Sequence, residues 1–451
     1  MSTPLRAEGS DPVSSRRQHA RLCHAASLWE EIRIASAPAD RWLGNYFFRN
    51  RKKLGSQDRR FLSQTIYSLF RHRSYIAAWA DFLGGPHDAL LWASLGALLD
   101  GQITGAQWAE ASPLNEKQTA FVSKKCASFL AFKFPVLEPA SGSPALALRF
   151  SFPEWMVARW LRDFGSGRVR PLLEIYEKRP PLTVRVNPVK ISRHDLMQKF
   201  KKAGFSVRTC GLTPWAIVFE ERAAVFDLEE FKQGLFEVQD AGSQKVCEVL
   251  GLKPGQLVWD ACAGGGGKSL LMGAILENKG RIVATDIRPQ KLQDLKKRAK
   301  RAGLFNVFPA DLNRMDEIRS ARQGFDCILV DAPCSGTGTL RRNPDAKWKL
   351  TEDLFLRQQS EQVKILEGVL PRLRKGGRVF YVTCSLEKEE NEAVIEKVFS
   401  NRKDFRLIPL SGFGTVSAWG SRLWPSDEND GFFAAAAEKI EATTDMETSS
   451  I

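Results

Sequence analysis

The chain has 451 residues, of which 43% are hydrophobic and 26% charged, a balance typical of a globular protein. No apolar run approaches the roughly 18–20 residues that cross a bilayer, and the polar N-terminus lacks the apolar core of a signal peptide. We therefore expect a cytoplasmic protein. The eight cysteines form no CxxC pair and there are only five histidines, so we expect neither a disulfide framework nor a bound metal.

The formal net charge of +14 favours a polyanionic partner, nucleic acid first, although an ordinary basic surface could give the same total. The local distribution favours nucleic acid, because cations crowd residues 41–73, where Asp58 is the one acid. The cations are Arg41, Arg49, Arg51, Lys52, Lys53, Arg59, Arg60, Arg71 and Arg73. Aromatic residues are interleaved, but Phe61, Ile66, Leu69 and Phe70 fit a helical stripe that is more typical of a core than of base stacking.

In chain order, residues 1–17 read as a disordered tail and residues 18–140 as a helical domain. Asp58 is a candidate cap for a helix through the following residues, and the SGSP at 141–144 reads as a linker.

Residues 145–238 predict two linker helices, and then a strand, a helix and two strands, which together form a small α+β unit. From 239 to 437 strands alternate with helices, a pattern that predicts a parallel sheet covered on both faces. Residues 438–451 read as a flexible tail.

Ligands bind parallel α/β sheets at the carboxyl ends of the strands, and chemically useful side chains fall at those ends in this sequence. They are Asp260, Asp286, Asp311, Asp331, Cys334 and Cys384. We expect one crevice that gathers all six.

The stretch DACAGGGGK (260–268) follows the first of these strands. Its glycines allow a tight turn and close approach to a ligand, yet it fits neither GxGxxG nor the phosphate-binding GxxxxGK[ST] well, and a plain flexible turn is the alternative. Asp286, which follows the next strand, can accept hydrogen bonds from two ribose hydroxyls or can cap a helix. Asp311 can reach an adenine edge, so this half of the sheet predicts an adenosine-containing cofactor.

The second half of the sheet carries Asp331 and Cys334 on one loop and Cys384 after another strand. A lone cysteine after a strand is usually a small buried hydrophobe, and Cys262 and Cys327 fit that description. Two cysteines at neighbouring strand ends beside a carboxylate suggest chemistry instead. A thiolate that adds to C6 of a pyrimidine makes C5 nucleophilic, a nearby acid stabilises the ring, and the thiol must afterwards be expelled.

Several longer stretches resemble the RNA 5-methylcytosine methyltransferases of the Nol1/Nop2/Sun group, the bacterial ribosomal RNA members in particular. They are FEVQDAGSQKV (236–246), DACAGGGGKS (260–269), ATDI (284–287), DAPCSGTGTLRRNPDAKW (331–348), YVTCSLEKEENE (381–392) and DGFFAA (430–435). Upstream, RPPLTVRVNP (179–188) resembles the family's small RNA-recognition-like unit. LGSQDRRFLSQTIYSLFRHR (54–73) resembles its helical, antitermination-factor-like domain.

The resemblance implies an α/β fold. A Rossmann-like domain dependent on S-adenosylmethionine would follow a helical N-terminal domain and a small α+β unit. It makes Cys384 the nucleophile, has Cys334 assist product release and has Asp331 contact the cytosine. The residues it places around the cofactor are Asp260, Cys262, Ala263, Gly264, Gly265, Gly266, Gly267, Lys268, Asp286, Arg288, Asp311 and Asp331. It also implies a monomer that methylates C5 of a cytosine in RNA, ribosomal RNA first.

Two departures from the family pattern stand out. Gly264 and Gly265 replace the usual alanine and proline, which should loosen the loop and weaken cofactor affinity, and WPSDEND before DGFF lacks a histidine often found there. Three alternatives stay open: the same chemistry on transfer RNA, an amino-group methyltransferase that needs no cysteine, and a non-catalytic RNA-binding assembly factor. The intact cysteine pair weighs against the last.

Overall fold

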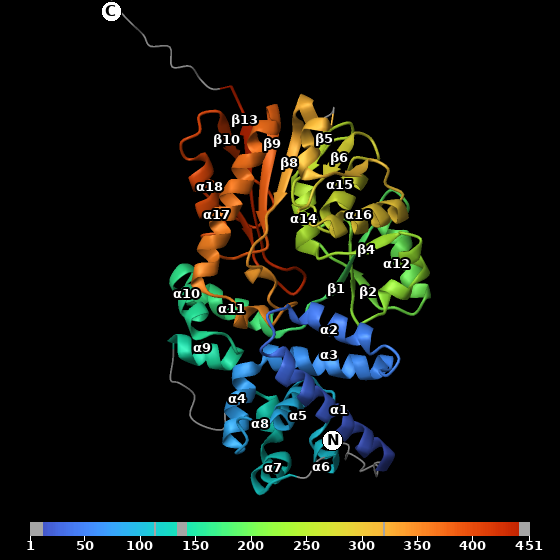
Figure 1. The fold of residues 1–451 in the computed structure, drawn as a ribbon, viewed down its shortest axis with the longest axis vertical. Coiled ribbons are helices and arrows are strands. Elements are labelled where there is room, and N and C mark those ends of the chain that lie inside the picture. The colour runs from blue at the N-terminus through green and yellow to red at the C-terminus, as the bar shows by residue number, and fades with distance from the viewer. Residues whose placement is uncertain (1–11, 112–113, 133–141, 319–320, 442–451) are drawn as a thin grey trace, which may run out of the picture. The chain divides into compact units, whose positions relative to one another are not determined.

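A computed structural model describes residues 12–111, 114–132, 142–318 and 321–441 (Figure 1). The chain divides into two compact units, each considered by itself below. One comprises Met1–Arg179 and Leu340–Lys349, and the other comprises Pro180–Thr339 and Leu350–Ile451. The predicted division into a helical domain, a small α+β unit and a catalytic domain stays a prediction.

The first unit is helical, as the sequence predicted. Its helices are α1 (Pro12–Ile32), α2 (Ala39–Arg49), α3 (Ser56–Arg71), α4 (Arg73–Phe82), α5 (Ala89–Leu99), α6 (Gly105–Ala111), α7 (Glu116–Ala120), a π-helical turn (Phe121–Lys125), α8 (Cys126–Leu130), α9 (Gly142–Phe150), α10 (Glu154–Phe164) and α11 (Ser166–Glu177). Helix α5, ALLWASLGALL, is apolar on nearly every face and lies in the middle of the core. The Asp88 carboxylate caps it by accepting hydrogen bonds from the backbone N–H groups of Leu90 and Leu91.

Three local predictions for this unit are corrected. Helix α1 begins at Pro12, inside the tail predicted for residues 1–17, and residues 1–11 lie outside the described part. Helix α9 begins at Gly142 inside the predicted linker, because the apolar run that follows has a core to pack against. Asp58 lies in the first turn of α3 rather than capping it, and its carboxylate accepts a 2.8 Å hydrogen bond from Arg21.

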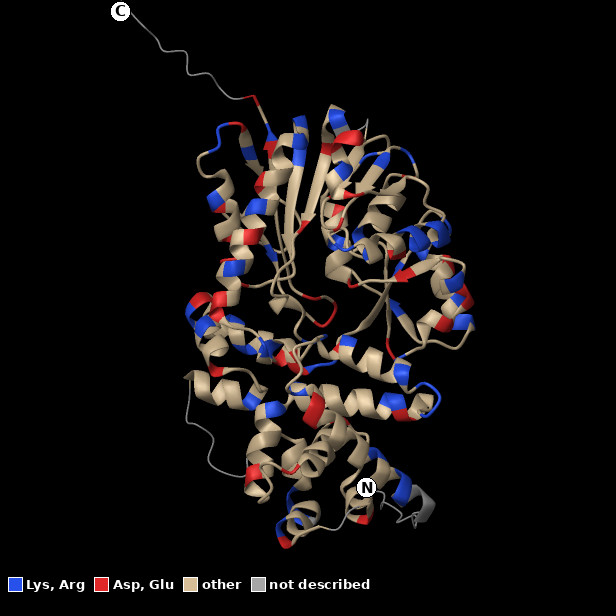
Figure 2. Cartoon of the chain, viewed as in Figure 1, with Lys and Arg blue, Asp and Glu red and all other residues tan. Residues whose placement is uncertain are grey.

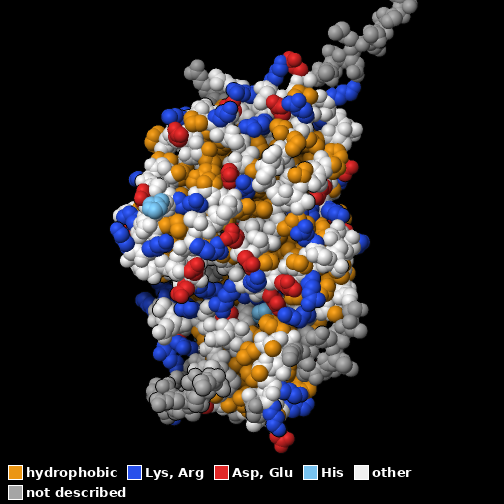
Figure 3. Space-filling model, turned by 180° about the vertical axis from the view of Figure 1, so that it is seen from behind, with side chains coloured by type: hydrophobic (Ala, Val, Ile, Leu, Met, Phe, Trp, Pro, Cys, Tyr) orange, Lys and Arg blue, Asp and Glu red, His pale blue; other side chains and the backbone are white. Residues whose placement is uncertain are grey.

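The basic segment 41–73 divides between surface and core. The turn between α2 and α3 carries three consecutive exposed cations, Arg51, Lys52 and Lys53 (Figure 2), whereas Arg71 is buried and donates to the Arg341 carbonyl oxygen. Phe61, Ile66, Leu69 and Phe70 are buried, which confirms the predicted core stripe. On the face seen in Figure 3, many of the cations lie among acids and apolar groups.

The second unit contains two sheets. The smaller is antiparallel, in the order β2-β3-β1-β4, from β1 (Leu182–Val186), β2 (Val207–Thr209), β3 (Ala216–Phe219) and β4 (Phe236–Val238). Helices α12 (Arg193–Lys202) and α13 (Glu229–Lys232) accompany it, and Phe200 of α12 packs in its core. These elements confirm the strand–helix–strand–strand order predicted from the sequence.

The larger sheet has nine strands in the order β11-β12-β13-β9-β8-β5-β6-β7, with β10 paired to β13. Its strands are β5 (Leu257–Asp260), β6 (Arg281–Ala284), β7 (Val307–Pro309), β8 (Phe325–Asp331), β9 (Leu373–Thr383), β10 (Phe405–Ile408), β11 (Thr415–Ser417), β12 (Gly420–Leu423) and β13 (Phe432–Lys439). The helices are α14 (Ala241–Val249), α15 (Gly267–Ile275), α16 (Pro289–Ala302), α17 (Glu352–Val369) and α18 (Glu392–Phe399). Strand β13 reaches into the tail predicted from residue 438, and residues beyond 441 lie outside the described part.

Strands β5 to β9 are parallel, and their side chains are buried on both faces by the helices. The sheet is mixed because β13 runs antiparallel to β9. Strand order reverses between β5 and β8, since the chain moves outward from β5 through β6 and β7 and then returns to β8. Such a reversal opens a crevice at the carboxyl ends of the strands.

Candidate active site

The glycine loop after β5 has a backbone that only glycine accommodates at one point. Gly266 has φ of +81°, and a Cβ there would lie 2.5 Å from Cγ of Leu295 on α16. Gly264 and Gly265, the two departures from the family pattern, are each tied to a side chain. The Gly264 N–H donates to Asp286 over 2.9 Å, and Arg298 donates to the Gly265 carbonyl oxygen over 2.5 Å. Side-chain hydrogen bonds therefore restrain a loop that the sequence alone predicted to be loose.

Next to this loop a pocket of about 480 Å³ opens between the ends of β6 and β7. Asp286 and Asp311 both line it, as predicted. Its apolar walls, which include Ile287, Pro309 and Leu312, were not predicted from the sequence. Ile287 is 86% exposed, so it offers an uncovered apolar surface to a ring. The sequence signal for this wall is an apolar residue, Ile287, directly after Asp286 at the end of a strand.

The polar groups of this pocket suit a ribose. Asp286 lies two residues beyond β6, and its carboxylate accepts from both the backbone and the guanidinium of Arg288. Burial raises the pKa of Asp286, but the hydrogen bonds from Arg288 outweigh it and hold the pKa below the usual range. Asp311 accepts from the Asn313 N–H and begins a 3₁₀ turn. An ionised acceptor beside an apolar slot fits the predicted adenosine-containing cofactor.

Asp260, at the end of β5, is fully buried under the glycine loop. Its Oδ2 atom accepts a 2.6 Å hydrogen bond from Ser269, whereas Oδ1 has no partner among the described residues. Burial raises the pKa of this carboxyl to about 7. Buried acceptor atoms normally have a hydrogen-bond donor, so a ligand could donate a hydrogen bond to Oδ1 of Asp260. The neighbouring thiol of Cys262 has its pKa raised to about 12 by burial, so it offers no reactive thiolate.

An ion pair links the glycine loop to the strand that precedes the first cysteine. Lys268, in the first turn of α15, donates to Oδ2 of Asp331 over 2.6 Å. Burial alone would lower the pKa of Lys268, but the charge and hydrogen bond of Asp331 outweigh it and raise that pKa. Asp331 accepts from Lys268 while its side chain remains about one third exposed, at 32%.

The two predicted catalytic thiols are in contact. Cys334 follows β8 and Cys384 directly follows β9; these strands are paired in parallel, and the two Sγ atoms are 3.4 Å apart. The hydrogen bond to Cys384, together with burial, raises the pKa of Cys334 well above that of a free thiol. Cys334 therefore keeps its proton and can donate it in a hydrogen bond to a thiolate at Cys384.

The remaining buried cysteines differ from this pair. Burial raises the pKa of Cys247 and of Cys327 to about 12. Both thiols sit in the apolar core of the large sheet, which confirms the prediction that Cys327 is a packing residue.

Backbone contacts tie three of the sequence motifs to one another at this edge. The Gly338 N–H donates to the Cys384 carbonyl oxygen over 2.8 Å, and the Gly431 N–H donates to the Gly338 carbonyl oxygen over 2.9 Å. A Cβ on Gly338 would lie 2.4 Å from that Gly431 carbonyl oxygen. The DAPCSGTG, TCS and DGFF stretches thus form one packed structure around the thiols.

Within the described residues, no cluster of His, Cys, Asp and Glu side chains could hold a metal ion. In the same ranges no helix combines the length and the hydrophobicity that a membrane span requires.

Comparison with known proteins identifies the family. The family described as 16S rRNA methyltransferase RsmB/F matches residues 247–438, and the ferredoxin-like domain of RsmF/B-like methyltransferases matches residues 152–226. A "Probable ribosomal RNA small subunit methyltransferase B" of Synechocystis is 30% identical over 305 residues, which are 65% of this chain and 68% of the relative. The Yersinia enterocolitica ribosomal RNA small subunit methyltransferase B is 33% identical over 286 residues, which are 63% and 65% of the two chains.

Solved structures show the same fold. The crystal structure of PH0851 superposes with a TM-score of 0.74 at 24% identity and covers 96% of this chain and all of its own. A methyltransferase homologue from Pyrococcus horikoshii has a TM-score of 0.58 at 32% identity and covers 67% of this chain and all of its own. Together the matches confirm the resemblance inferred from the motifs and the predicted fold class. Methyltransferases of this kind depend on S-adenosylmethionine, which confirms the predicted cofactor. The chain belongs to the RsmB/F family of ribosomal RNA small subunit methyltransferases.

Proposed function

We propose that this protein is an S-adenosylmethionine-dependent RNA methyltransferase that modifies C5 of a cytosine in small-subunit ribosomal RNA. It would act as a monomer in the cytoplasm. The observation that carries the proposal is the contact between Cys334 and Cys384, 3.4 Å apart, at the carboxyl ends of adjacent parallel strands. A methyltransferase that acts on an amino group needs no thiol, and a binding protein needs no pair of them.

The proposed reaction starts at Cys384. Its thiolate attacks C6 of the cytosine, the C5–C6 double bond gives up its electrons to the ring, and C5 becomes nucleophilic. S-Adenosylmethionine, when bound, supplies the methyl group that C5 accepts. The proton on C5 is then lost, the double bond re-forms, and the Cys384 thiolate is expelled. Cys334 would assist this release, since its sulfur touches that of Cys384.

Asp331 would contact the target cytosine, and Lys268 would link Asp331 to the S-adenosylmethionine site. Asp331 presents its carboxyl group at the end of β8, and the exposed part can accept a hydrogen bond from the cytosine amino group. Lys268 pairs with that carboxylate from the glycine-loop side. The ion pair would therefore connect the cytosine site with the S-adenosylmethionine site. Asp260, Asp286 and Asp311, with the glycine loop and Arg288, would hold S-adenosylmethionine.

The basic turn between α2 and α3 would contribute phosphate contacts, and the target cytosine must leave the base stack to reach a thiol. The test is incubation of the purified protein with tritiated S-adenosylmethionine and either unmodified 30S ribosomal RNA or unmodified transfer RNA. We expect label in ribosomal RNA, and bisulfite sequencing of RNA from cells that lack the protein should show one cytosine losing its protection. Label in transfer RNA alone would transfer the proposal to that substrate, and label outside C5 would overturn it.

A further inference from the structure

We propose that Glu390 is the positioning residue that holds the two thiols in contact. Glu390 lies just before α18 and is fully buried. In the described part of the chain, its carboxylate accepts from Ser335, Ser385 and Gln362 and from neither sulfur atom. Its carboxylate instead binds the residue after each cysteine, Ser335 and Ser385, and so joins the two loops that carry the thiols.

The contacts use both carboxylate oxygens. Oε1 accepts from the Ser335 N–H over 2.8 Å and from Gln362 over 3.2 Å. Oε2 accepts from the Ser385 hydroxyl over 2.5 Å and from the Ser335 hydroxyl. Four donors match the roughly four acceptor sites of an ionised carboxylate, so the network is complete only when Glu390 is charged. Burial raises the pKa of Glu390, while these hydrogen bonds oppose that rise.

The backbone around Glu390 is fixed as well. The Tyr381 hydroxyl, on β9, donates to the Glu390 carbonyl oxygen over 2.6 Å, and Gln362 also donates to the Pro333 carbonyl oxygen over 2.8 Å, one residue before Cys334. Helix α17, strand β9 and the turn before α18 therefore converge on both loops. An anchor of this kind sets the distance between two groups without reacting with either.

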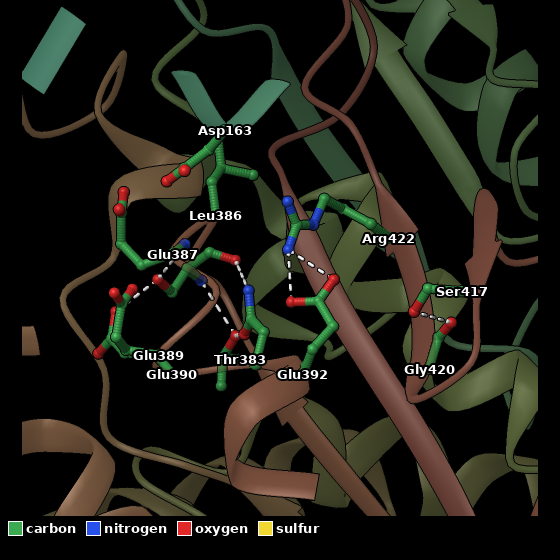
Figure 4. A network of polar contacts seen from close by, with 12 residues as sticks. Asp163, Thr383, Leu386, Glu387, Glu389, Glu390, Glu392, Ser417, Gly420 and Arg422 are labelled. Atoms are coloured by element: carbon green, nitrogen blue, oxygen red, sulfur yellow. Dashed lines mark hydrogen bonds and ion pairs between the residues drawn. The ribbon is translucent and has the colours of Figure 1, made fainter. Parts of the chain in front are cut away.

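The neighbouring Glu392 supplies a matched comparison. It lies two residues further along, and in Figure 4 it points toward Arg422, away from Glu390. Its two oxygens accept from Arg422 over 2.8 Å each, and no contact joins it to either cysteine loop among the described residues. Removing Glu392 therefore removes an acid from the same segment without touching the thiols' anchor.

The positioning role is distinct from proton transfer. Two of the four donors to Glu390 are hydroxyls, which can rotate to accept hydrogen bonds from an amide. Glu390→Gln should therefore keep the loops together, with Oε1 still facing the Ser335 N–H. A proton carrier would lose its function in that variant.

The first test is independent of the proposed function. Azodicarboxamide takes one hydrogen from each of two thiols and becomes the hydrazine, leaving a disulfide, so the rate of Cys334–Cys384 disulfide formation, read by peptide mapping, reports their contact. We expect about a tenfold slower rate in Glu390→Ala and in Glu390→Asp, which withdraws the carboxylate by one methylene. Glu390→Gln and Glu392→Gln should stay within about threefold of the wild type. Wild-type rates in the folded Ala or Asp variant would overturn the proposal.

The second test rests on the proposed function and uses the covalent RNA adduct. If Glu390 places Cys334 for release, Glu390→Asp should accumulate adduct on a denaturing gel and slow turnover about tenfold, with unchanged affinity for S-adenosylmethionine. Glu390→Gln should restore turnover. A Gln variant as slow as the Asp variant would mean proton transfer and overturn the positioning role. Failure of every variant to form adduct would count against the proposed function instead, and the disulfide rates would still decide the role of Glu390.

Discussion

At the scale of single residues, Cys334 and Cys384 have the same side chain in different surroundings. Cys334 is the thiol whose pKa is raised well above normal, by its hydrogen bond to Cys384 and by burial. The family resemblance alone ranked them in the sequence, because spacing along the chain gives no measure of which sulfur donates to the other. The fold brings the two sulfur atoms into contact, and the ranking of the two thiols stays a prediction.

Asp260 allows a pH-dependent prediction at this scale. Its pKa is about 7 in the folded protein and about 3.9 in an unfolded chain, so between these values the folded state binds a proton that the unfolded state does not. Stability should therefore rise as pH falls from 8 to 5, by about 2.5 kcal/mol. Asp260→Asn removes this titration. In cofactor-free protein its melting temperature should exceed that of the wild type most at pH 8, by a margin that shrinks toward pH 5.

Thermal unfolding of both proteins across that pH range is the measurement. A difference in melting temperature that is the same at pH 5 and pH 8 would contradict the buried, raised-pKa account of Asp260.

Among the elements, the glycine loop between β5 and α15 positions the cofactor half of the site. Gly266 needs its left-handed backbone and its missing side chain, since Leu295 fills the space a Cβ would take. Gly267 has no positive φ, and the nearest atom to a Cβ there is Nε2 of Gln239 at 3.7 Å. The two neighbours thus differ in whether they tolerate a methyl group.

We expect Gly266→Ala to lower the free energy of unfolding by about 1–3 kcal/mol, from backbone strain and overpacking. Gly267→Ala should change it by less than about 1 kcal/mol. Denaturant unfolding measures both free energies, with the slope of free energy against denaturant held equal to that of the wild type. Equal losses in the two variants would contradict the conclusion that Gly266, and not Gly267, excludes a side chain.

The elements also show how far sequence reasoning reached. Alternating apolar strands and amphipathic helices predicted the parallel sheet, and the acids and cysteines at strand ends predicted the site's contents. The strands β10 to β13 and the apolar wall at Ile287 were missed, because short strands, an alanine-rich strand and exposed apolar residues leave no alternating signal. Glu390 lies within the YVTCSLEKEENE motif, but its partners Ser335 and Gln362 are distant in sequence. Spacing along the chain therefore predicted no role for it.

At the scale of the whole molecule, the net charge of +14 can bind RNA only where several cations are exposed side by side. The turn between α2 and α3 meets that condition, whereas Arg71 is used inside the helical unit. The charge excess therefore predicted a nucleic-acid partner from the sequence, but burial decided which cations are available to it.

Replacing four exposed cations, at the end of α2 and in the turn that follows it, by glutamine should weaken RNA binding and lower the slope of log affinity against log salt by about 3. They are Arg49, Arg51, Lys52 and Lys53. The control removes equal charge near the amino end of β9 and in the turn after α18, at Arg374, Lys375, Arg402 and Lys403. Filter binding from 50 to 300 mM salt measures both, and equal slopes for the two variants would contradict the interface.

The most direct measurement of the central claim is a denaturing gel of the protein after incubation with S-adenosylmethionine and unmodified ribosomal RNA. Cys334→Ala should retain a covalent RNA–protein band, because Cys384 can attack but release is impaired. Cys384→Ala should show no band and no methyl transfer. A band in Cys384→Ala that is absent in Cys334→Ala would reverse the roles of the two thiols, and methylation by Cys384→Ala at the wild-type rate would contradict covalent catalysis altogether.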